Sequence, residues 1–334
     1  MSSTILVTGA GGWLGSLIAE ALHSDPTAPN TRLILADVVE PKAPAGSNAL
    51  VIQADLTDRA QVNALFTTSF GIPNTVYCMH GIMSRGSEEN FELGIKVNVD
   101  SVRLLLEETR SVNAPKPIKF IFTSSLAVYG GPLPDIITPK TIAVPQSSYG
   151  TAKLMSEIMI NEYTRRGWVD GRIMRLPTIT VRPGPPAAAT SAFISGIIRE
   201  PLSGVEATCP IGDSYESPEL SLPLWLASPE TTIKNLILAR HIPAERFMAH
   251  TRVVCLPGFT ATIKDELEAL VKVAGKEALQ LVKFVDDPVS RRIVSSWPSV
   301  FDNTYALSLG FVADEGGMEP IVRRFQQGVV KSDR

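Results

Sequence analysis

The stretch Ile5-Leu-Val-Thr-Gly9-Ala-Gly-Gly12-Trp-Leu-Gly15 decides the fold. An apolar run is followed at once by three glycines at a Gly-x-x-Gly-x-x-Gly spacing, and an amphipathic segment follows them. In such a unit Gly9 permits the tight turn, Gly12 lets the backbone approach a pyrophosphate, and Gly15 lets the helix pack on the strand. The free amides at the start of the helix face the anion. The stretch therefore predicts a strand, a phosphate-binding turn and a helix.

Strand-like and helix-like segments alternate through the first 180 residues. The predicted strands are short and rich in Val, Ile and Leu, which is typical of parallel strands covered on both faces. They span residues 4–8, 31–37, 49–53, 75–79, 118–124 and 171–176. Amphipathic stretches at 13–23, 58–66, 88–112 and 147–166 separate them. This alternation predicts an α/β fold, a Rossmann-like doubly wound parallel sheet.

The sequence changes in character after residue 177. Prolines and glycines gather in Arg182-Pro-Gly-Pro-Pro and Cys209-Pro-Ile-Gly, and helix-like pieces remain at 190–199, 229–239, 263–274 and 320–331. We expect residues 1–180 to form the dinucleotide-binding domain. Residues 181–334 are expected to form a smaller α/β region that binds substrate over the carboxyl edge of the sheet.

Composition and charge exclude several classes of function. The chain has 334 residues, is 44% hydrophobic, and carries 31 basic against 34 acidic side chains. Such a chain forms a globular protein without the basic excess of a nucleic-acid or anionic-membrane binder. No signal segment is visible and no apolar run reaches the roughly 18 residues that span a bilayer, so the expected location is the cytoplasm. The spacing of the three cysteines and four histidines predicts no metal site.

Asp37 ends the second predicted strand, 22 residues after Gly15. A carboxylate at this position accepts both ribose hydroxyls of an adenosine and repels a 2′-phosphate. No arginine follows in Val38-Val-Glu-Pro, although Lys42 lies nearby. The sequence therefore favours NAD over NADP.

Tyr149-Gly-Thr-Ala-Lys153 lies at the start of a predicted helix. Four helical residues rise about 6 Å and return to nearly the same face, so the phenol and the ammonium share one cleft. The ammonium is expected to lower the pKa of the phenol and make it a usable acid or base. Ser125 lies at the carboxyl end of the fifth predicted strand, where ligands of open α/β sheets bind. The three residues predict chemistry on a hydroxyl or carbonyl group.

These motifs together resemble the extended short-chain dehydrogenases/reductases over about residues 3–185. Further matches are Asp55-Leu56, Asn98 and the run Ser124-Ser-Leu-Ala-Val-Tyr-Gly130. The resemblance implies that Ser125 orients the substrate oxygen, Tyr149 is the acid/base, and Lys153 also binds the nicotinamide ribose. The residues expected at the cofactor are Gly9, Gly12, Trp13, Leu14, Gly15, Asp37, Asp55, Leu56, Met79, Tyr149, Lys153, Pro177 and Thr178. One departure is Cys78-Met-His80-Gly81, where many relatives have two alanines; we expect His80 in a loop near the cofactor.

The second half of the chain indicates a small substrate. Two runs that are usual in nucleotide-sugar enzymes, Asn-Val-Tyr-Gly-Pro and Tyr-Val-x-Asp-Val, are absent. The segments 175–186, 191–202 and 224–229 are instead similar to the D-erythronate dehydrogenases, which oxidise the C2 hydroxyl of a four-carbon sugar acid with NAD. A carboxylated substrate needs a fixed cation, and a guanidinium matches its geometry. The residues expected at the substrate are Ser84, Ser125, Tyr149, Arg182 and, as a second cation, Arg199.

Other functions remain open on the same scaffold. A nucleotide-sugar epimerase and a reductase of small carbonyl compounds would use the same motifs, whereas a dehydratase would need an acidic pair where Leu126-Ala127 stands. A dinucleotide-sensing regulator would commonly lack the tyrosine-lysine pair. The predicted helices 88–112 and 147–166 match those of the four-helix dimer interface in the wider family, so a homodimer is expected.

Overall fold

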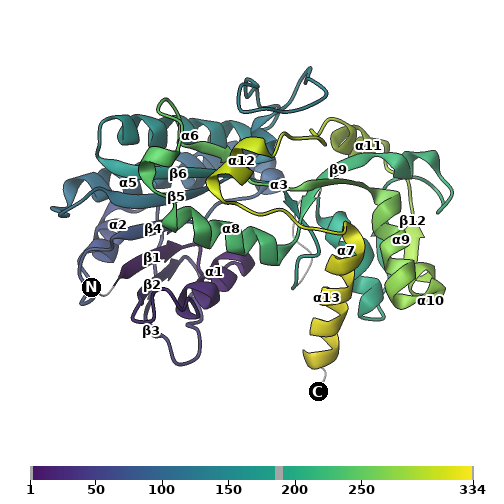
Figure 1. Cartoon of the computed structure of the whole chain (residues 1–334), viewed down its shortest axis with the longest axis horizontal. Coiled ribbons are helices and arrows are strands. Elements are labelled where there is room, and N and C mark those ends of the chain that lie inside the picture. Colours follow the sequence, from purple (N-terminus) through teal and green to yellow (C-terminus); the bar gives the residue numbers. More distant parts are fainter. Residues whose placement is uncertain (1–2, 185–190, 333–334) are drawn as a thin grey trace.

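A computed structural model describes residues 3–184 and 191–332 of the chain. Seven strands form one sheet in the order β10-β6-β5-β4-β1-β2-β3, and all neighbours in it are parallel (Figure 1). The strands are β1 (Thr4–Thr8), β2 (Arg32–Asp37), β3 (Asn48–Gln53), β4 (Thr75–Cys78), β5 (Ile118–Ser125), β6 (Val169–Leu176) and β10 (Val253–Cys255). The expected α/β class and doubly wound parallel sheet are confirmed.

Helices cover both faces of this sheet, which explains its continuous apolar strands. Successive strand residues point to opposite faces. Ile5 and Val7 pack with α1 (Trp13–His23) and α8 (Pro229–His241). Leu6, between them, belongs to the opposite core layer, to which α2 (Arg59–Phe66), α5 (Ser101–Ser111) and α6 (Ser148–Arg165) contribute. Each face of the sheet therefore has its own apolar layer.

The predicted continuous helix over 88–112 is wrong. The segment consists of α3 (Ser84–Glu89), α4 (Phe91–Ile95), a π-helical turn (Lys96–Asp100) and α5. Asn90 separates the first two because its φ of −139° is not helical, and its side chain accepts a 3.0 Å hydrogen bond from the Leu93 amide at the start of α4. By contrast, α1 has the predicted bounds, and α6 differs from its predicted bounds by one residue at each end.

The later part of the chain forms a smaller region that is visible at the right of Figure 1. β7 (Thr178–Ile179), β9 (Pro223–Ala227) and β11 (Phe259–Thr262) form one small sheet, and β8 (Ala207–Cys209) pairs with β12 (Val282–Phe284). The remaining helices are α7 (Ala192–Leu202), α9 (Ile263–Ala274), α10 (Lys276–Gln280), α11 (Pro288–Ser295), α12 (Thr304–Leu309) and α13 (Met318–Ser332). The predicted helix 190–199 corresponds to α7; Thr190 lies outside the described residues.

Chain segments from both sides of residue 180 build the large sheet. β10 pairs with β6, and α8 packs on the same face as α1. β7 follows β6 after a single residue and begins the small sheet, so the smaller region is joined to the carboxyl edge of the large one. The turns that carry the predicted site residues leave the large sheet at this same edge. No helix within 3–184 and 191–332 is long and apolar enough to cross a bilayer.

Candidate active site

The glycine turn between β1 and α1 has the shape that a bound pyrophosphate requires. Gly9 has a φ of +72°, and a Cβ atom there would lie 2.6 Å from the His80 amide nitrogen. A Cβ atom on Gly15 would overlap the Gly9 carbonyl oxygen, so this glycine permits the close contact of helix and turn. Gly12 is the N-cap of α1, and the amides of the first helical turn, from Trp13 and Leu14 onward, have no partner within the helix. The turn therefore fits a dinucleotide phosphate.

Two acidic side chains lie where the adenosine end of a dinucleotide is expected. Asp37 ends β2, and its Oδ2 accepts a 2.9 Å hydrogen bond from the Gly11 amide in the glycine turn. Asp55 follows β3; its Oδ1 accepts hydrogen bonds from the Thr57 amide (2.9 Å) and hydroxyl (2.8 Å), and these bonds lower the pKa of the carboxyl. Leu56 beside it is buried. Asp37 is thus held against the glycine turn, and the contacts of Asp37 and Asp55 with a cofactor stay a prediction.

His80, in the loop after β4, contacts hydroxyl groups of β1 and α5. Its Nδ1 lies 2.8 Å from the Thr8 hydroxyl and its Nε2 lies 2.6 Å from the Ser101 hydroxyl. The Ser101 hydroxyl donates to the Val97 carbonyl, so it accepts the Nε2 proton of His80. The Thr8 hydroxyl, the partner of Nδ1, also lies 3.3 Å from the Tyr77 carbonyl. Burial, with a smaller effect of the Lys153 charge, lowers the pKa of His80 to about 3, so the ring is neutral. Its side chain joins β1 to α5, and the preceding Met79 amide donates to the Thr8 carbonyl at 3.2 Å.

Ser125, Tyr149 and Lys153 come together at the carboxyl edge of the sheet. Ser125 is the last residue of β5, and Tyr149 and Lys153 lie on the first turns of α6. The Ser125 hydroxyl lies close enough to the Tyr149 phenol to lower the pKa of that phenol. The Lys153 ammonium lies 5.6 Å from the centre of the Tyr149 ring and donates a 2.9 Å hydrogen bond to the Thr123 carbonyl. The expected proximity of the three side chains is thus present in the structure.

Burial dominates the protonation of this group. It raises the pKa of the Tyr149 phenol to about 12, against the smaller lowering effect of the nearby Ser125 hydroxyl. It also lowers the pKa of the Lys153 ammonium to about 8, opposed by Cys78 and Glu157. In the protein by itself, burial therefore outweighs the expected lowering of the pKa of the phenol. The cause is desolvation, which disfavours both charged forms.

Two acidic residues that the sequence analysis missed hold α6 in place. Glu88 on α3 accepts a 2.6 Å hydrogen bond from the Ser148 amide, immediately before Tyr149. Glu157 on α6 binds Arg175 of β6 through two hydrogen bonds of 2.9 and 2.6 Å. The spacing of Tyr149, Lys153 and Glu157, four residues apart each time, places all three on one helix face and could have revealed Glu157. Only the folded chain brings Glu88 to α6.

The two predicted substrate arginines lie side by side but differ in their contacts. The Arg199 guanidinium donates to the Arg182 carbonyl (3.0 Å) and to Glu200 (2.6 Å), so it is engaged within the protein. The Arg182 amide donates to the Ser195 hydroxyl at 3.0 Å, while its guanidinium makes no hydrogen bond or ion pair with the residues of the described ranges. Burial, followed by the charge of Arg199, lowers the pKa of Arg182. Arg182 is thus a partly desolvated cation.

The remaining predicted residues lie on loops at the same edge. Pro177 connects β6 to β7, and Thr178, the first residue of β7, pairs with Leu226 of β9. Ser84 is half-buried at the start of α3. Trp225 is 5% exposed and packs against Phe301 with ring centres 5.1 Å apart, so it belongs to the apolar core. In 3–184 and 191–332, no group of three or more His, Cys, Asp or Glu side chains is placed to hold a metal ion.

Residues 5–214 match the model of the NAD-dependent epimerase/dehydratase family, and this match covers more than half of the chain. The chain belongs to this family. D-erythronate dehydrogenases from Cupriavidus necator and Haemophilus influenzae are both 39% identical to it, over 97% and 96% of this chain and 98% of each relative. A solved structure described as a nucleoside-diphosphate-sugar epimerase from Agrobacterium tumefaciens has a TM-score of 0.87 and 32% identity, over 99% of this chain and 94% of that one.

These findings confirm the extended short-chain dehydrogenase/reductase scaffold and a dehydrogenase as the class of enzyme. Membership of the epimerase/dehydratase family implies a nicotinamide cofactor. The L-threonine 3-dehydrogenase of Trypanosoma brucei, with a TM-score of 0.82 and 23% identity, shares the fold. Because one scaffold carries several activities, the substrate must be inferred from the site.

Proposed function

We propose that the protein is an NAD-dependent dehydrogenase that oxidises the C2 hydroxyl of a small sugar acid, such as D-erythronate, to the 2-oxo acid. The observation that carries this proposal is the meeting of Ser125, Tyr149 and Lys153 at the carboxyl edge, beside the glycine turn. The 39% identity to two D-erythronate dehydrogenases over nearly the whole chain supports the choice of substrate.

The chain's own residues move and hold the proton. When bound, NAD supplies the hydride acceptor and a positive charge that opposes the effect of burial on the nearby phenol. Tyr149, as the phenolate, takes the proton of the C2 hydroxyl, and the Ser125 hydroxyl orients the same oxygen. Lys153, whose pKa of about 8 leaves it charged at neutral pH, stabilises the phenolate. The rigid strand end and helix hold these groups in place before the substrate binds.

We expect NAD to be preferred over NADP because of Asp37. Its carboxylate is held against the glycine turn by the Gly11 amide, where a ribose 2′-phosphate would meet a negative charge. The two ribose hydroxyls can instead donate to this carboxylate. A ratio of kcat/KM values for the two cofactors that favours NADP would contradict this preference.

The test of the proposed function is a panel of substrates with wild-type protein and Tyr149→Phe. Wild type is expected to reduce NAD with four-carbon 2-hydroxy acids, read as absorbance at 340 nm. Tyr149→Phe keeps the ring but removes the proton acceptor, so we expect turnover to fall by about 10²–10⁴-fold while the Kd for NAD stays nearly constant. Turnover by the variant at the wild-type rate would remove Tyr149 from the mechanism.

Arg182 is proposed to bind the substrate carboxylate. A partly desolvated guanidinium gains from an anion, and a planar fork binds a carboxylate through two hydrogen bonds. We expect Arg182→Gln to raise the KM for a sugar acid by roughly 10–100-fold, because the variant loses a pair of charge-assisted hydrogen bonds to the carboxylate. The KM of wild type for the corresponding uncharged polyol should already be high and should change little in the variant. Equal effects on both substrates would contradict a carboxylate contact.

A nucleotide-sugar epimerase is the second candidate, favoured by the likeness to the Agrobacterium structure. Wild-type protein supplied with UDP-sugars would then interconvert them without net formation of NADH. A reductase of small carbonyl compounds would instead consume NADH with simple aldehydes or ketones. The same panel of substrates therefore separates the three activities.

We further propose a homodimer formed through α6 and its neighbours. On the outward face of α6, Ile158 and Met155 are 62% and 43% exposed, and Phe91 on the adjoining α4 is 58% exposed. Apolar side chains gathered on a helix face are typical of a protein interface. The second copy would cover them without blocking the opposite, buried face that carries Tyr149 and Lys153.

A further inference from the structure

We propose that Glu157 is a positioning residue that fixes Ser125, Lys153 and the end of β6 relative to one another and keeps the charge on Lys153. This inference rests on the roles proposed above for Ser125 and Lys153. Glu157 is 1% exposed, and its two oxygens accept three hydrogen bonds. The donors are the Ser124 hydroxyl at 2.5 Å and two guanidinium nitrogens of Arg175 at 2.9 and 2.6 Å.

Each partner of this carboxylate adjoins a residue of the site. Ser124 directly precedes Ser125 on β5, and Glu157 lies one helical turn after Lys153 on α6. Arg175 lies two residues before Pro177, one of the residues expected at the cofactor. One carboxylate therefore ties together the two strands and the helix that carry the reactive groups, with a bidentate geometry that fixes direction as well as distance.

Glu157 also supplies the negative charge near the Lys153 ammonium. The titratable groups that face Lys153 are Tyr149, Cys78, His80 and Glu157. Burial raises the pKa of both the Tyr149 phenol and the Cys78 thiol to about 12, and His80 is a neutral ring. Glu157, paired with the Arg175 guanidinium at 2.6 Å, is the carboxylate of this set. Cys78 and then Glu157 raise the pKa of Lys153 against the larger effect of burial.

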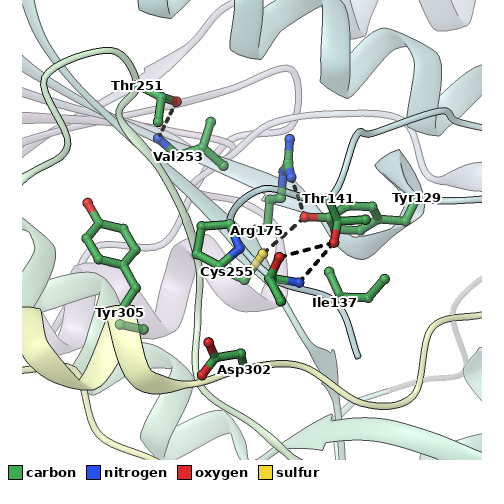
Figure 2. A pocket seen from close by; sticks show the side chains of 12 residues that line it. Tyr129, Ile137, Thr141, Arg175, Thr251, Val253, Cys255, Asp302 and Tyr305 are labelled. Carbon is green, nitrogen blue, oxygen red and sulfur yellow. Dashed lines mark hydrogen bonds between the residues drawn. The ribbon is translucent and has the colours of Figure 1, made fainter. Parts of the chain in front are cut away.

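The network continues from Arg175 towards the protein surface. A third guanidinium nitrogen donates to the Tyr129 hydroxyl at 2.6 Å, and this hydroxyl lies 3.5 Å from the Cys255 sulfur. Figure 2 shows these contacts at the wall of a pocket that is also lined by Thr141 and Tyr305. Arg175 is thus held both by Tyr129 and by Glu157. Glu157 therefore binds a guanidinium whose position is fixed.

A purely stabilising role is a poor explanation for this pair. Removing two charges from water costs as much as the pair regains, so apolar side chains of similar volume often stabilise a core equally well. A buried carboxylate placed between the catalytic strand and helix acts instead on the geometry and charge of the site.

The experiment compares Glu157→Gln and Ser124→Ala with wild type and with a control, Asp25→Asn. Asp25 is a buried carboxylate near Arg240 (3.6 Å), after the end of α1 and away from the site. For each folded variant we would measure kcat with D-erythronate, the Kd for NAD, the melting temperature, and the titration of the Lys153 side chain by ¹³Cε-lysine NMR in the free protein. Lys153→Arg assigns the NMR signal.

We expect Glu157→Gln to lower kcat by roughly 10–100-fold while the Kd for NAD stays nearly constant. The substitution changes the positions of the reacting groups but removes no contact with the cofactor. The Lys153 titration should move to lower pH by about 1 unit, because a nearby negative charge is lost. Ser124→Ala should lower kcat by a smaller factor and leave the Lys153 titration in place. Asp25→Asn should lower only the melting temperature.

An unmoved Lys153 titration in Glu157→Gln, or a kcat equal to that of wild type, overturns the inference. If Glu157→Gln does not fold, the apolar pair Glu157→Leu with Arg175→Met replaces it, since it leaves no unpaired charge; the same shift and loss are expected, and a wild-type titration overturns the inference. If wild type oxidises no hydroxy acid, the proposed function fails. The NMR titration still decides whether Glu157 keeps the charge on Lys153.

Discussion

Lys153 is held at the site against the tendency of an ammonium to stay in water. It is 3% exposed, and burial lowers its pKa from the ordinary value of 10.5 to about 8. The unfolded chain therefore binds the proton more strongly, and between about pH 8 and 10.5 the free energy of unfolding rises with pH. Below pH 8 the full cost of the buried charge is present. The residue that we propose to stabilise the phenolate is thus one that destabilises the fold at neutral pH.

Replacing this lysine should stabilise the protein while inactivating it. We expect Lys153→Met to raise the free energy of unfolding at pH 7 by roughly 1–3 kcal/mol, the cost of the pKa shift less the lost hydrogen bond to Thr123. Chemical denaturation at pH 7 and pH 10 measures this gain, which should shrink at the higher pH as the wild-type ammonium loses its proton. Lys96→Met, at an exposed position, is the matched control. A loss of stability at pH 7 would contradict the assigned cost.

The sequence predicted the roles of residues that form local patterns, but it did not predict roles that depend on contacts with residues distant in the chain. The Tyr149-x-x-x-Lys153 spacing and the serine at a strand end are local patterns, and they predicted three side chains that the fold brings together. The sequence ranked Arg182 ahead of Arg199 as the substrate cation, but it did not show that Arg199 is engaged by the Arg182 carbonyl and Glu200. The direction of the pKa shift at Tyr149 depends on the burial of its phenol, which the spacing of residues in the sequence does not reveal.

At the scale of elements, β1 and α1 could be predicted to the residue because their signals are local. An apolar run, a glycine spacing and an amphipathic helix all lie within Thr4–His23. The segment 84–111 could not be predicted in this way. Its break at Asn90 and its π-helical turn coincide with tertiary bonds, in which the Asn98 side chain binds the backbone of Ile82. β10 has three residues, too few for a periodic signal, and it joins the large sheet only through β6.

The packing of α1 on the glycine turn gives a prediction for this element. A Cβ atom on Gly15 overlaps the Gly9 carbonyl, whereas one on Gly12 would lie 3.3 Å from the same oxygen. We expect Gly15→Ala to lower the free energy of unfolding by about 2–4 kcal/mol through displacement of the helix, and to abolish NAD binding. Gly12→Ala should weaken NAD binding with a loss of stability below about 1 kcal/mol. Calorimetry and thermal melts separate the two effects, and equal melting temperatures would refute the packing role of Gly15.

At the scale of the whole molecule, α6 presents two different faces, and we propose a separate role for each. Tyr149 and Lys153 lie on the buried face, against β5, and Ile158 and Met155 lie on the exposed one. A second copy seated on the exposed face would therefore brace the same helix that positions the acid/base. Assembly and catalysis would then be linked through the position of one element.

This arrangement predicts that a charge on the outward face of α6 dissociates the dimer. We expect Ile158→Glu to raise the dimer dissociation constant by roughly 30-fold or more, because a carboxylate would be desolvated where an apolar side chain was buried. Sedimentation equilibrium measures the constant. The matched control is Val289→Glu on α11, an apolar residue of similar exposure (53%) in the smaller region, which should leave the mass unchanged. A wild-type monomer, or an Ile158→Glu variant as dimeric as wild type, would show that α6 faces solvent in the working enzyme.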